Sequence, residues 1–243
     1  MKPEEYGRMF AAEERQWWYA GMRAITQALL DGQLAPAGAG RVLDAGCGTG
    51  ANLVSLRRYG PTLGVDISEE ALAFCRRRGL PVVRGSVLDL PFASGAFGLV
   101  TSFDVLYHRW VTDDRAALGE LTRVLAPGGL LFVRVPALRL LWGAHDEAVL
   151  SRHRYTRAEL RGLLAGSGLE VLRASYCNSL LLPLLLARRG LDRLTGRQGS
   201  DVSFLPAPFE TAFRALLGLE ARLVRVASLP VGASVLAVAR KPS

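Results

Sequence analysis

VLDAGCGTG, residues 42–50, is the stretch that decides the fold, because it joins an apolar run to three closely spaced glycines. Its first residues are typical of a buried parallel strand, and a helical pattern follows Gly50. Glycines at such positions let the backbone turn tightly and approach a ligand closely. A strand, a glycine loop and a helix in this order predict a nucleotide-binding α/β sheet.

The spacing of this loop favours one class of ligand. A dinucleotide fingerprint reads GxGxxG, whereas this loop reads GxGxG and follows the acidic Asp44. A carboxylate there repels a pyrophosphate but can accept hydrogen bonds from an ammonium group, directly or through water. Asp66, 16 residues after Gly50, can accept hydrogen bonds from both ribose hydroxyls; alternatively, it only begins a helix ahead of Ser68. The pattern therefore favours an aminoacyl-nucleoside over a dinucleotide.

The rest of the chain repeats an alternation of short β-rich runs and longer amphipathic segments. Ser68 and Thr156 are expected to begin two of the helices. The alternation predicts a doubly wound, mostly parallel seven-stranded sheet, a Rossmann-like α/β fold whose last two strands could form an antiparallel edge. The predicted strands cover residues 41–44, 62–66, 81–84, 98–103, 130–135, 169–175 and 234–239.

Two segments lie outside this alternation. Residues 1–34 predict a helical cap with the aromatic Trp17, Trp18 and Tyr19, and residues 178–230 predict a helical insertion before the last strand. Insertions over the strand ends of such sheets usually shape a substrate pocket. We therefore predict a single domain, 1–243, made of the cap, a ligand-binding core at 35–177, the insertion and a last strand at 231–243.

The most apolar run of the insertion is Leu180–Ala187, which Arg188, Arg189 and Arg193 follow. It is far shorter than the roughly 20 residues of a membrane-spanning helix, and Pro183 interrupts it. Two interpretations remain, a helix that rests on a membrane surface and a buried helix. The short length and the proline favour the buried helix.

The composition is that of an ordinary globular protein with an excess of positive charge. Of the 243 residues, 50% are hydrophobic and 21% are charged, and the formal net charge is +8. The arginines are scattered over the polar faces of predicted helices, which favours solvated surface over nucleic-acid binding. Three cysteines without CxxC spacing indicate neither a disulfide framework nor a zinc site, and the N-terminus lacks the apolar core of a signal peptide. We expect a cytoplasmic protein without metal, nucleic-acid partner or transmembrane span.

Beyond the glycine loop, further segments resemble the successive motifs of class I S-adenosylmethionine (AdoMet)-dependent methyltransferases. They are LGVDIS at 63–68, GSVLDLPFASGAFGLVTSFDVLYH at 85–108 and LTRVLAPGGLLFVRVP at 121–136. The chain also resembles a bacterial subfamily, and this likeness covers nearly its whole length. The subfamily features are a WW-aromatic segment (Trp17–Tyr19), an HDE…RYT segment (His145–Thr156), an SD…LP.P insertion (Ser200–Pro208) and an LP.G.S..AVA.KP ending (Leu229–Pro242).

The resemblance implies AdoMet as the cofactor, S-adenosylhomocysteine as the product, and a set of cofactor contacts. Residues 44–50 would hold the methionine part and Asp66 the ribose. Ser86 and Val87 would flank the adenine, with Phe103–Asp104 at the sulfonium end. The implied cofactor-binding residues are Asp44, Ala45, Gly46, Cys47, Gly48, Gly50, Asp66, Ile67, Ser86, Val87, Phe103 and Asp104.

Three departures from the family pattern matter. The family often has Asp where Ser86 stands, so the adenine contact is expected to be weaker or carried by the backbone. Gly98 replaces a common Asp, and we expect it to affect stability more than chemistry. Relatives usually read DVLEH where this chain reads DVLYH at residues 104–108, followed by Arg109-Trp110.

Three side chains are candidates for removing a proton from an acceptor. Tyr107 and His108 follow the fourth predicted strand, where ligands sit in such sheets; a packing Tyr and a helix-capping His are equally good interpretations. His145, beyond the fifth strand, is the leading general-base candidate if one is needed, and a role in pinning the loop is the alternative. The predicted substrate-binding residues are Trp18, Tyr19, Trp142, Asp146, His153 and Tyr155.

These residues together predict methyl transfer from AdoMet to O or N of a small or medium-sized acceptor, such as one of specialised metabolism. Much of the catalysis would come from aligning the acceptor with the methyl group. One alternative is a membrane-surface methyltransferase that acts on a lipid-linked acceptor. Another is an AdoMet-fold protein with a non-methylating function, for which the altered segment at 104–110 is the hint. A nicotinamide-dependent oxidoreductase is disfavoured by the GxGxG loop behind Asp44. The acceptor itself and the oligomeric state stay open.

Overall fold

The computed structural model describes residues 3–195 and 206–243, and its strands form one sheet. The order across this sheet is β3-β2-β1-β4-β5-β7-β6. β7 runs antiparallel to both of its neighbours, and all other pairs are parallel. The predicted fold class is confirmed, including the antiparallel edge. The strands are β1 (Val42–Ala45), β2 (Thr62–Asp66), β3 (Val82–Arg84), β4 (Phe97–Phe103), β5 (Leu125–Pro136), β6 (Glu170–Cys177) and β7 (Ser234–Arg240).

Local signals set where several helices begin. The Ser68 hydroxyl accepts a hydrogen bond from the N–H of Ala71, and Thr156 forms a capping box with Glu159, as the sequence predicted. Asp113 caps a further helix, α5, that the sequence analysis did not single out. The α-helices are α1 (Pro3–Ala12), α2 (Trp17–Leu30), α3 (Ala51–Leu56), α4 (Glu69–Arg77), α5 (Asp114–Val124), α6 (Ala144–Ala148), α7 (Arg157–Gly166), α8 (Leu182–Thr195) and α9 (Ala207–Val226); short 3₁₀ turns are η1 (Arg57–Tyr59) and η2 (Arg139–Leu141).

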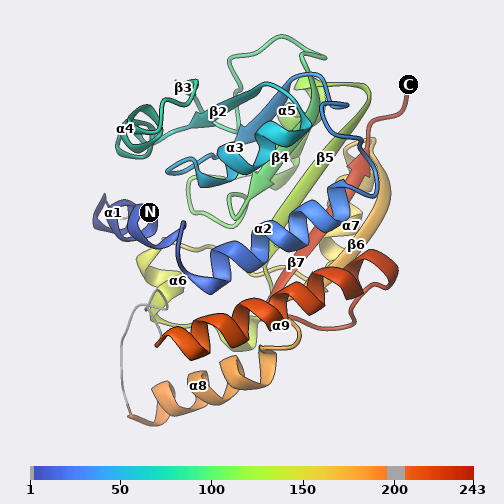
Figure 1. Ribbon diagram of the computed structural model, residues 1–243. Coiled ribbons are helices and arrows are strands. Elements are labelled where there is room, and N and C mark those ends of the chain that lie inside the picture. The colour runs from blue at the N-terminus through green and yellow to red at the C-terminus, as the bar shows by residue number, and fades with distance from the viewer. Residues whose placement is uncertain (1–2, 196–205) are drawn as a thin grey trace.

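Helices cover both faces of the sheet (Figure 1). β5 shows how one strand serves both faces, because successive side chains of a strand point in opposite directions. Leu131 and Val133 belong to the core under α5 and α7, whereas Leu130 and Phe132 belong to the core under α2 and α9. All four side chains are buried. The sheet is therefore the middle layer of three.

The N-terminal helices and the insertion pack against each other although they are far apart in the chain. The backbone N–H of Trp17 donates to the Glu210 carboxylate at 2.7 Å, and the Trp17 ring meets Phe213 edge-on. Gly21 on α2 lies so close to Leu217 on α9 that a Cβ there would overlap the leucine side chain. A small residue at this point lets the two helices approach and cover one face of the sheet together.

α8 is the outermost helix of the insertion (Figure 1), and the prediction of a buried helix is wrong. Leu182 is buried, but Leu184, Leu191 and Leu194 are 52%, 57% and 86% exposed. Most of the helix lies beyond the core, so its apolar side chains have little to pack against. Within 3–195 and 206–243, no helix is both long and apolar enough to cross a membrane. The SD…LP.P motif falls largely outside the described residues, of which it includes only 206–208.

Candidate active site

A cavity of about 380 Å³ runs along the edge of the sheet where the parallel strands end. We call one part the loop end, lined by Gly46–Thr49, Asp66 and Ser86, which follow or end β1, β2 and β3. We call the other part the insertion end, lined by residues that follow β5 and β6 and by α8. The strand order places these two groups on opposite sides of β4. Open α/β sheets bind their ligands at this edge.

The glycine loop needs glycine for its backbone shape and for space. Gly46 and Gly50 have φ values of +83° and +92°, which side chains rarely adopt. A Cβ on Gly46 would overlap Val105, and one on Gly50 would crowd Leu80 and Cys75. The loop therefore fits closely between the sheet and the following helices while Gly46 and Gly48 stay at the cavity wall.

Asp44 lies beneath this loop and does not line the cavity. It is fully buried, and its Oδ1 accepts a 2.7 Å hydrogen bond from the Thr101 hydroxyl. Its Oδ2 has no hydrogen-bond partner among the described residues. Burial raises the pKa of the Asp44 carboxyl to about 7. Any contact with a bound ammonium group would have to pass through water or a movement of the loop.

Asp66 lines the loop end, and both of its carboxylate oxygens already hold the backbone in place. Oδ2 accepts from the N–H of Gly48 and Oδ1 from the N–H of Ser68, both at 2.9 Å. Each oxygen keeps a second lone pair for a further donor. Asp66 thus joins the glycine loop to the start of α4, so its local structural role and the predicted ribose contact are compatible.

The predicted adenine contacts also reach the cavity. Ile67, Ser86 and Val87 line it, but the Ser86 hydroxyl accepts from the N–H of Leu88 at 3.1 Å. A serine used in this way makes a turn after β3 and presents less polar surface to a ligand than an Asp would. Among the other predicted cofactor contacts, Cys47, Phe103 and Asp104 line the cavity, whereas Ala45 and Gly50 do not.

Gly98 has a packing explanation. It lies in β4, and a Cβ there would overlap the carbonyl oxygen of Ala39. The Gly98 N–H donates to the carbonyl of Arg41, so the backbone cannot easily move away. Any larger side chain at this position of β4, including that of Asp, would meet the same overlap.

A buried network that the sequence analysis did not predict fixes α1 over the glycine loop. Glu13 Oε1 accepts from the Thr49 hydroxyl at 2.6 Å and from the Arg78 guanidinium at 2.7 Å. Glu13 is buried and lines the cavity, as do Tyr6 and Met9 of α1. Since Glu13 and Arg78 are 65 residues apart, nothing in the local sequence marks the pair.

A second unpredicted pair lies at the middle of the cavity. Asp104 directly follows β4 with a φ of +55°, a conformation that non-glycine residues seldom adopt. Its carboxylate forms an ion pair with Arg134, and its N–H donates to the Arg134 carbonyl. The Arg134 guanidinium lies over the rings of Trp18 and Phe103, at 5.4 and 5.2 Å from their centroids. This arrangement holds charge and aromatic surface at one point of the cavity wall.

Tyr107 and His108 both line the cavity and stack on each other, with ring centroids 4.3 Å apart. Burial raises the pKa of Tyr107 well above its usual value and lowers that of His108 to about 4. Both side chains are therefore neutral near pH 7. His108 Nδ1 is buried without a hydrogen-bond partner within the described segments.

His145 lines the insertion end, but its neighbour Asp146 does not. Asp146 is buried and forms a two-point ion pair with Arg154, with both distances 2.9 Å, while also accepting from the N–H of Gly143. The predicted direct contact of Asp146 with substrate is therefore not seen. Arg154 is the member of the pair that reaches the cavity.

Three other predicted substrate contacts also turn away from the cavity. His153 pairs with Glu159 at 2.7 Å, and the Tyr155 hydroxyl donates to Asp114 at 3.0 Å. Trp142 is likewise absent from the cavity lining. These side chains stabilise the segment between β5 and α7. The sequence alone could not show in which direction they point.

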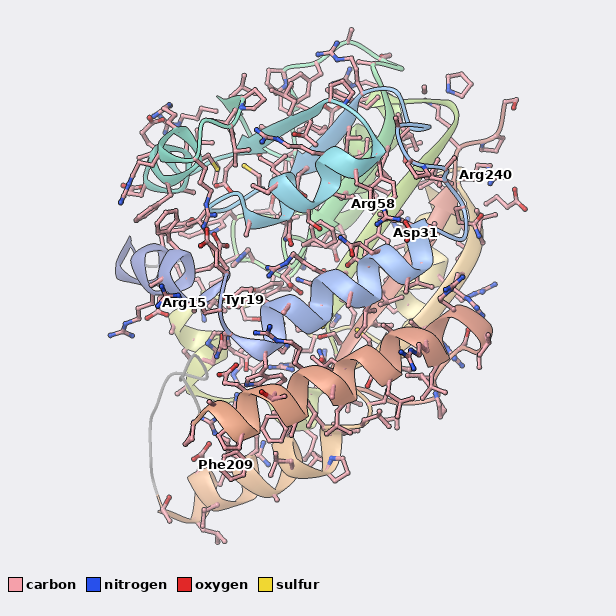
Figure 2. All side chains as sticks on the ribbon, in the orientation of Figure 1. Arg15, Tyr19, Asp31, Arg58, Phe209 and Arg240 are labelled. Atoms are coloured by element: carbon pink, nitrogen blue, oxygen red, sulfur yellow. The ribbon has the colours of Figure 1, made fainter. Side chains whose placement is uncertain are left out.

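The insertion end combines aromatic, apolar and cationic side chains. Trp18 and Tyr19, two of the predicted substrate-binding residues, line the insertion end. Tyr19 lies where α2 begins (Figure 2). Asn178, at the end of β6, has a φ of +57° and a buried Oδ1 without a partner in the described chain. The remaining residues that line this end include Met22, Arg134, Leu141, Arg154, Leu181, Leu185, Arg188, Arg189 and Ser234. The described residues contain no group of three or more His, Cys, Asp or Glu placed to hold a metal ion.

Comparison with known proteins agrees with this geometry. Residues 43–133 match the model of a family described as a methyltransferase domain. Over these residues the chain is similar to a methyltransferase domain. The match contains Gly46–Gly50, Asp66 and Asp104, so it includes the residues that line the loop end of the cavity. AdoMet is the cofactor of this family, as the sequence predicted.

The chain aligns with only part of each curated relative. A protein of Mycolicibacterium smegmatis named "Probable S-adenosylmethionine-dependent methyltransferase" is 32% identical over 167 residues, 65% of this chain and 61% of that protein. A demethylmenaquinone methyltransferase of Corynebacterium kroppenstedtii is 34% identical over 140 residues, 54% of this chain and 60% of that protein. The chain thus spans about three fifths of the length of these relatives.

Solved structures share the fold of the methyltransferase domain over a longer stretch. A SAM-dependent methyltransferase of Thermotoga maritima superposes with a TM-score of 0.60 at 21% identity, covering 98% of this chain and 95% of that one. A geranyl diphosphate C-methyltransferase of Streptomyces coelicolor, solved with S-adenosyl-L-homocysteine, superposes with a TM-score of 0.58 at 20% identity, covering 89% and 78%.

Proposed function

We propose that this chain transfers a methyl group from AdoMet to an oxygen or nitrogen of a small or medium-sized acceptor. The observation that carries the proposal is the cavity that joins the glycine loop and Asp66 to the aromatic and arginine-lined insertion end. Bound AdoMet supplies a methyl group that its sulfonium charge has already activated. The protein's part is then to bind both partners, align them and exclude water.

The loop end fits the cofactor by the chemistry of its atoms. Asp66 offers acceptor lone pairs to ribose hydroxyls from a position that two backbone N–H groups hold rigid. Asp44 keeps one buried oxygen that has no partner among the described residues, beneath the loop. A positively charged group near the loop would favour the ionised form of this carboxyl and oppose the effect of burial on its pKa.

The insertion end suits an acceptor with both apolar and polar parts. Trp18, Tyr19 and Met22 offer apolar surface that would exclude water from the reacting atoms. His145 is our candidate to take a proton from an acceptor hydroxyl, because it lines this end and its Nδ1 lacks a partner in the described residues. We propose His108 and Tyr107 as wall residues that position the acceptor.

Calorimetry of the purified chain with AdoMet and with S-adenosylhomocysteine tests the cofactor claim first. We expect micromolar binding of both. A mass-shift screen of hydroxyl- and amine-bearing compounds would then identify the acceptor. If neither cofactor form binds, the proposed function is wrong.

The Asp66→Ala variant tests the position of the cofactor. It should lose about 100-fold in AdoMet affinity, because two charge-assisted hydrogen bonds disappear. Glu69→Ala is the matched control, since this carboxylate lies exposed at the start of α4, three residues after Asp66, and pairs with Arg76. Equal affinity of the two variants, with both folded by circular dichroism, would show that the alignment of cofactor and cavity is wrong.

A further inference from the structure

Two helices of the insertion each carry an apolar face that the described residues leave exposed. On α8, Leu184, Ala187, Leu191 and Leu194 recur at intervals of three and four residues, so they share one side of the helix. All four are exposed. Isolated surface leucines need no explanation, but a stripe along about three turns of an outermost helix does.

α9 repeats the pattern. Phe209, Ala212, Leu216 and Leu219 follow the same spacing and are exposed, with Phe209 at 53% and Leu219 at 49%. Figure 2 shows Phe209 at the N-terminal end of α9. A different side of α9, which includes Leu217, is buried against α2. The exposed apolar side is therefore additional to the one that the fold uses.

The exposed charges beside these faces have one sign. Every exposed charged residue on α8 and α9 is an arginine, whereas the acidic Asp192 and Glu210 are half-buried and Glu220 is buried. Exposed apolar residues flanked by arginine are the composition of helices that lie in the interface of an anionic membrane. The exposed arginines are Arg188, Arg193, Arg214, Arg222 and Arg225.

We propose that the exposed apolar faces of α8 and α9 dock on an anionic lipid surface. The leucines would enter the headgroup boundary while exposed arginines such as Arg222 and Arg225 pair with lipid phosphates. Leu185 of α8 and Leu181, which directly precedes this helix, line the cavity. Docking would thus bring the insertion end of the cavity close to the bilayer. Binding to lipid can be measured without any methyl transfer. This proposal can therefore fail or succeed separately from the proposed function.

Co-sedimentation of the full chain with vesicles tests the proposal. We expect binding to vesicles of mixed phosphatidylcholine and phosphatidylglycerol and far less to phosphatidylcholine alone. Raising the salt from about 0.1 M to about 1 M should weaken the binding, because the Debye length falls from about 10 Å to about 3 Å. Leu191→Glu should lower the binding about tenfold, since it places a charge in the apolar face.

Val54→Glu is the matched control, because Val54 is a similarly exposed apolar residue on α3, outside the insertion. It should bind vesicles like the unaltered chain, and both variants should keep AdoMet affinity by calorimetry. Absence of vesicle binding, or equal binding to neutral and anionic vesicles, would overturn the proposal. So would a dimer in light scattering that Leu191→Glu dissociates, because the faces would then cover each other in two copies.

Discussion

At the residue scale, His145 is the side chain whose removal should affect turnover most selectively. His145→Ala should bind AdoMet normally and lower the rate of methyl transfer about 100-fold, if the acceptor must lose a proton in the reaction. Steady-state kinetics with the acceptor found by the mass-shift screen would measure this. His153→Ala is the control, because that ring pairs with Glu159 and does not line the cavity. Normal turnover in His145→Ala would remove the residue from the base role.

His108 should make the protein sensitive to acid. Burial lowers its pKa from 6.5 to about 4 in the folded chain. Between these values the unfolded chain binds a proton that the folded chain does not, so the free energy of unfolding should fall as the pH drops from about 6.5 to about 4. In His108→Gln this fall should be smaller by up to about 3 kcal/mol.

Urea unfolding of both proteins at several pH values would measure the difference. The raised pKa of Asp44 acts in the opposite direction, since its neutral form is favoured in the fold and its contribution is lost as the pH rises towards 7. This effect is common to both proteins and cancels in the comparison. Parallel pH profiles would contradict the assignment to His108.

Gly98→Ala should destabilise the fold without changing the cofactor site. The new Cβ would overlap the Ala39 carbonyl, at a cost of about 1–3 kcal/mol in the free energy of unfolding. Gly119→Ala on α5 is the control, because a Cβ there meets nothing within 4 Å and alanine favours a helix. Denaturant unfolding of the two variants decides the matter, and a Gly98→Ala protein as stable as the unaltered chain would contradict the packing explanation.

At the scale of single elements, the buried carboxylate of Glu13, directly after α1, ties this helix to Thr49 and Arg78. Glu13→Gln removes its charge opposite Arg78, so the backbone amides of α1 should exchange faster with solvent and AdoMet affinity should fall about tenfold. Hydrogen–deuterium exchange and calorimetry measure the two effects. Arg8→Gln on the same helix breaks only an exposed pair with Glu5 and should change neither. Unchanged exchange in Glu13→Gln would mean that apolar packing alone holds α1.

At the scale of the whole molecule, the sheet was predictable because its signals are local. Each of these signals occupies only a few consecutive residues: the glycine loop, the β-rich segments and the helix caps Ser68 and Thr156. The structure confirms the set of strands that they predicted. α5 was not predicted, although Asp113 caps it. The alternation of β-rich and amphipathic segments along the chain was sufficient to predict the fold class. No knowledge of long-range contacts was needed.

The sequence by itself thus determined the fold class, the glycine loop and the cofactor family of the methyltransferase domain. Only the tertiary structure decided which side chains face the cavity. Asp146 turns to Arg154, Glu13 joins Thr49 and Arg78, and α8 lies exposed where a buried helix was expected. The physical reason is that spacing along the chain sets backbone conformation, whereas the direction and partner of a side chain depend on elements that fold back from far away in the sequence.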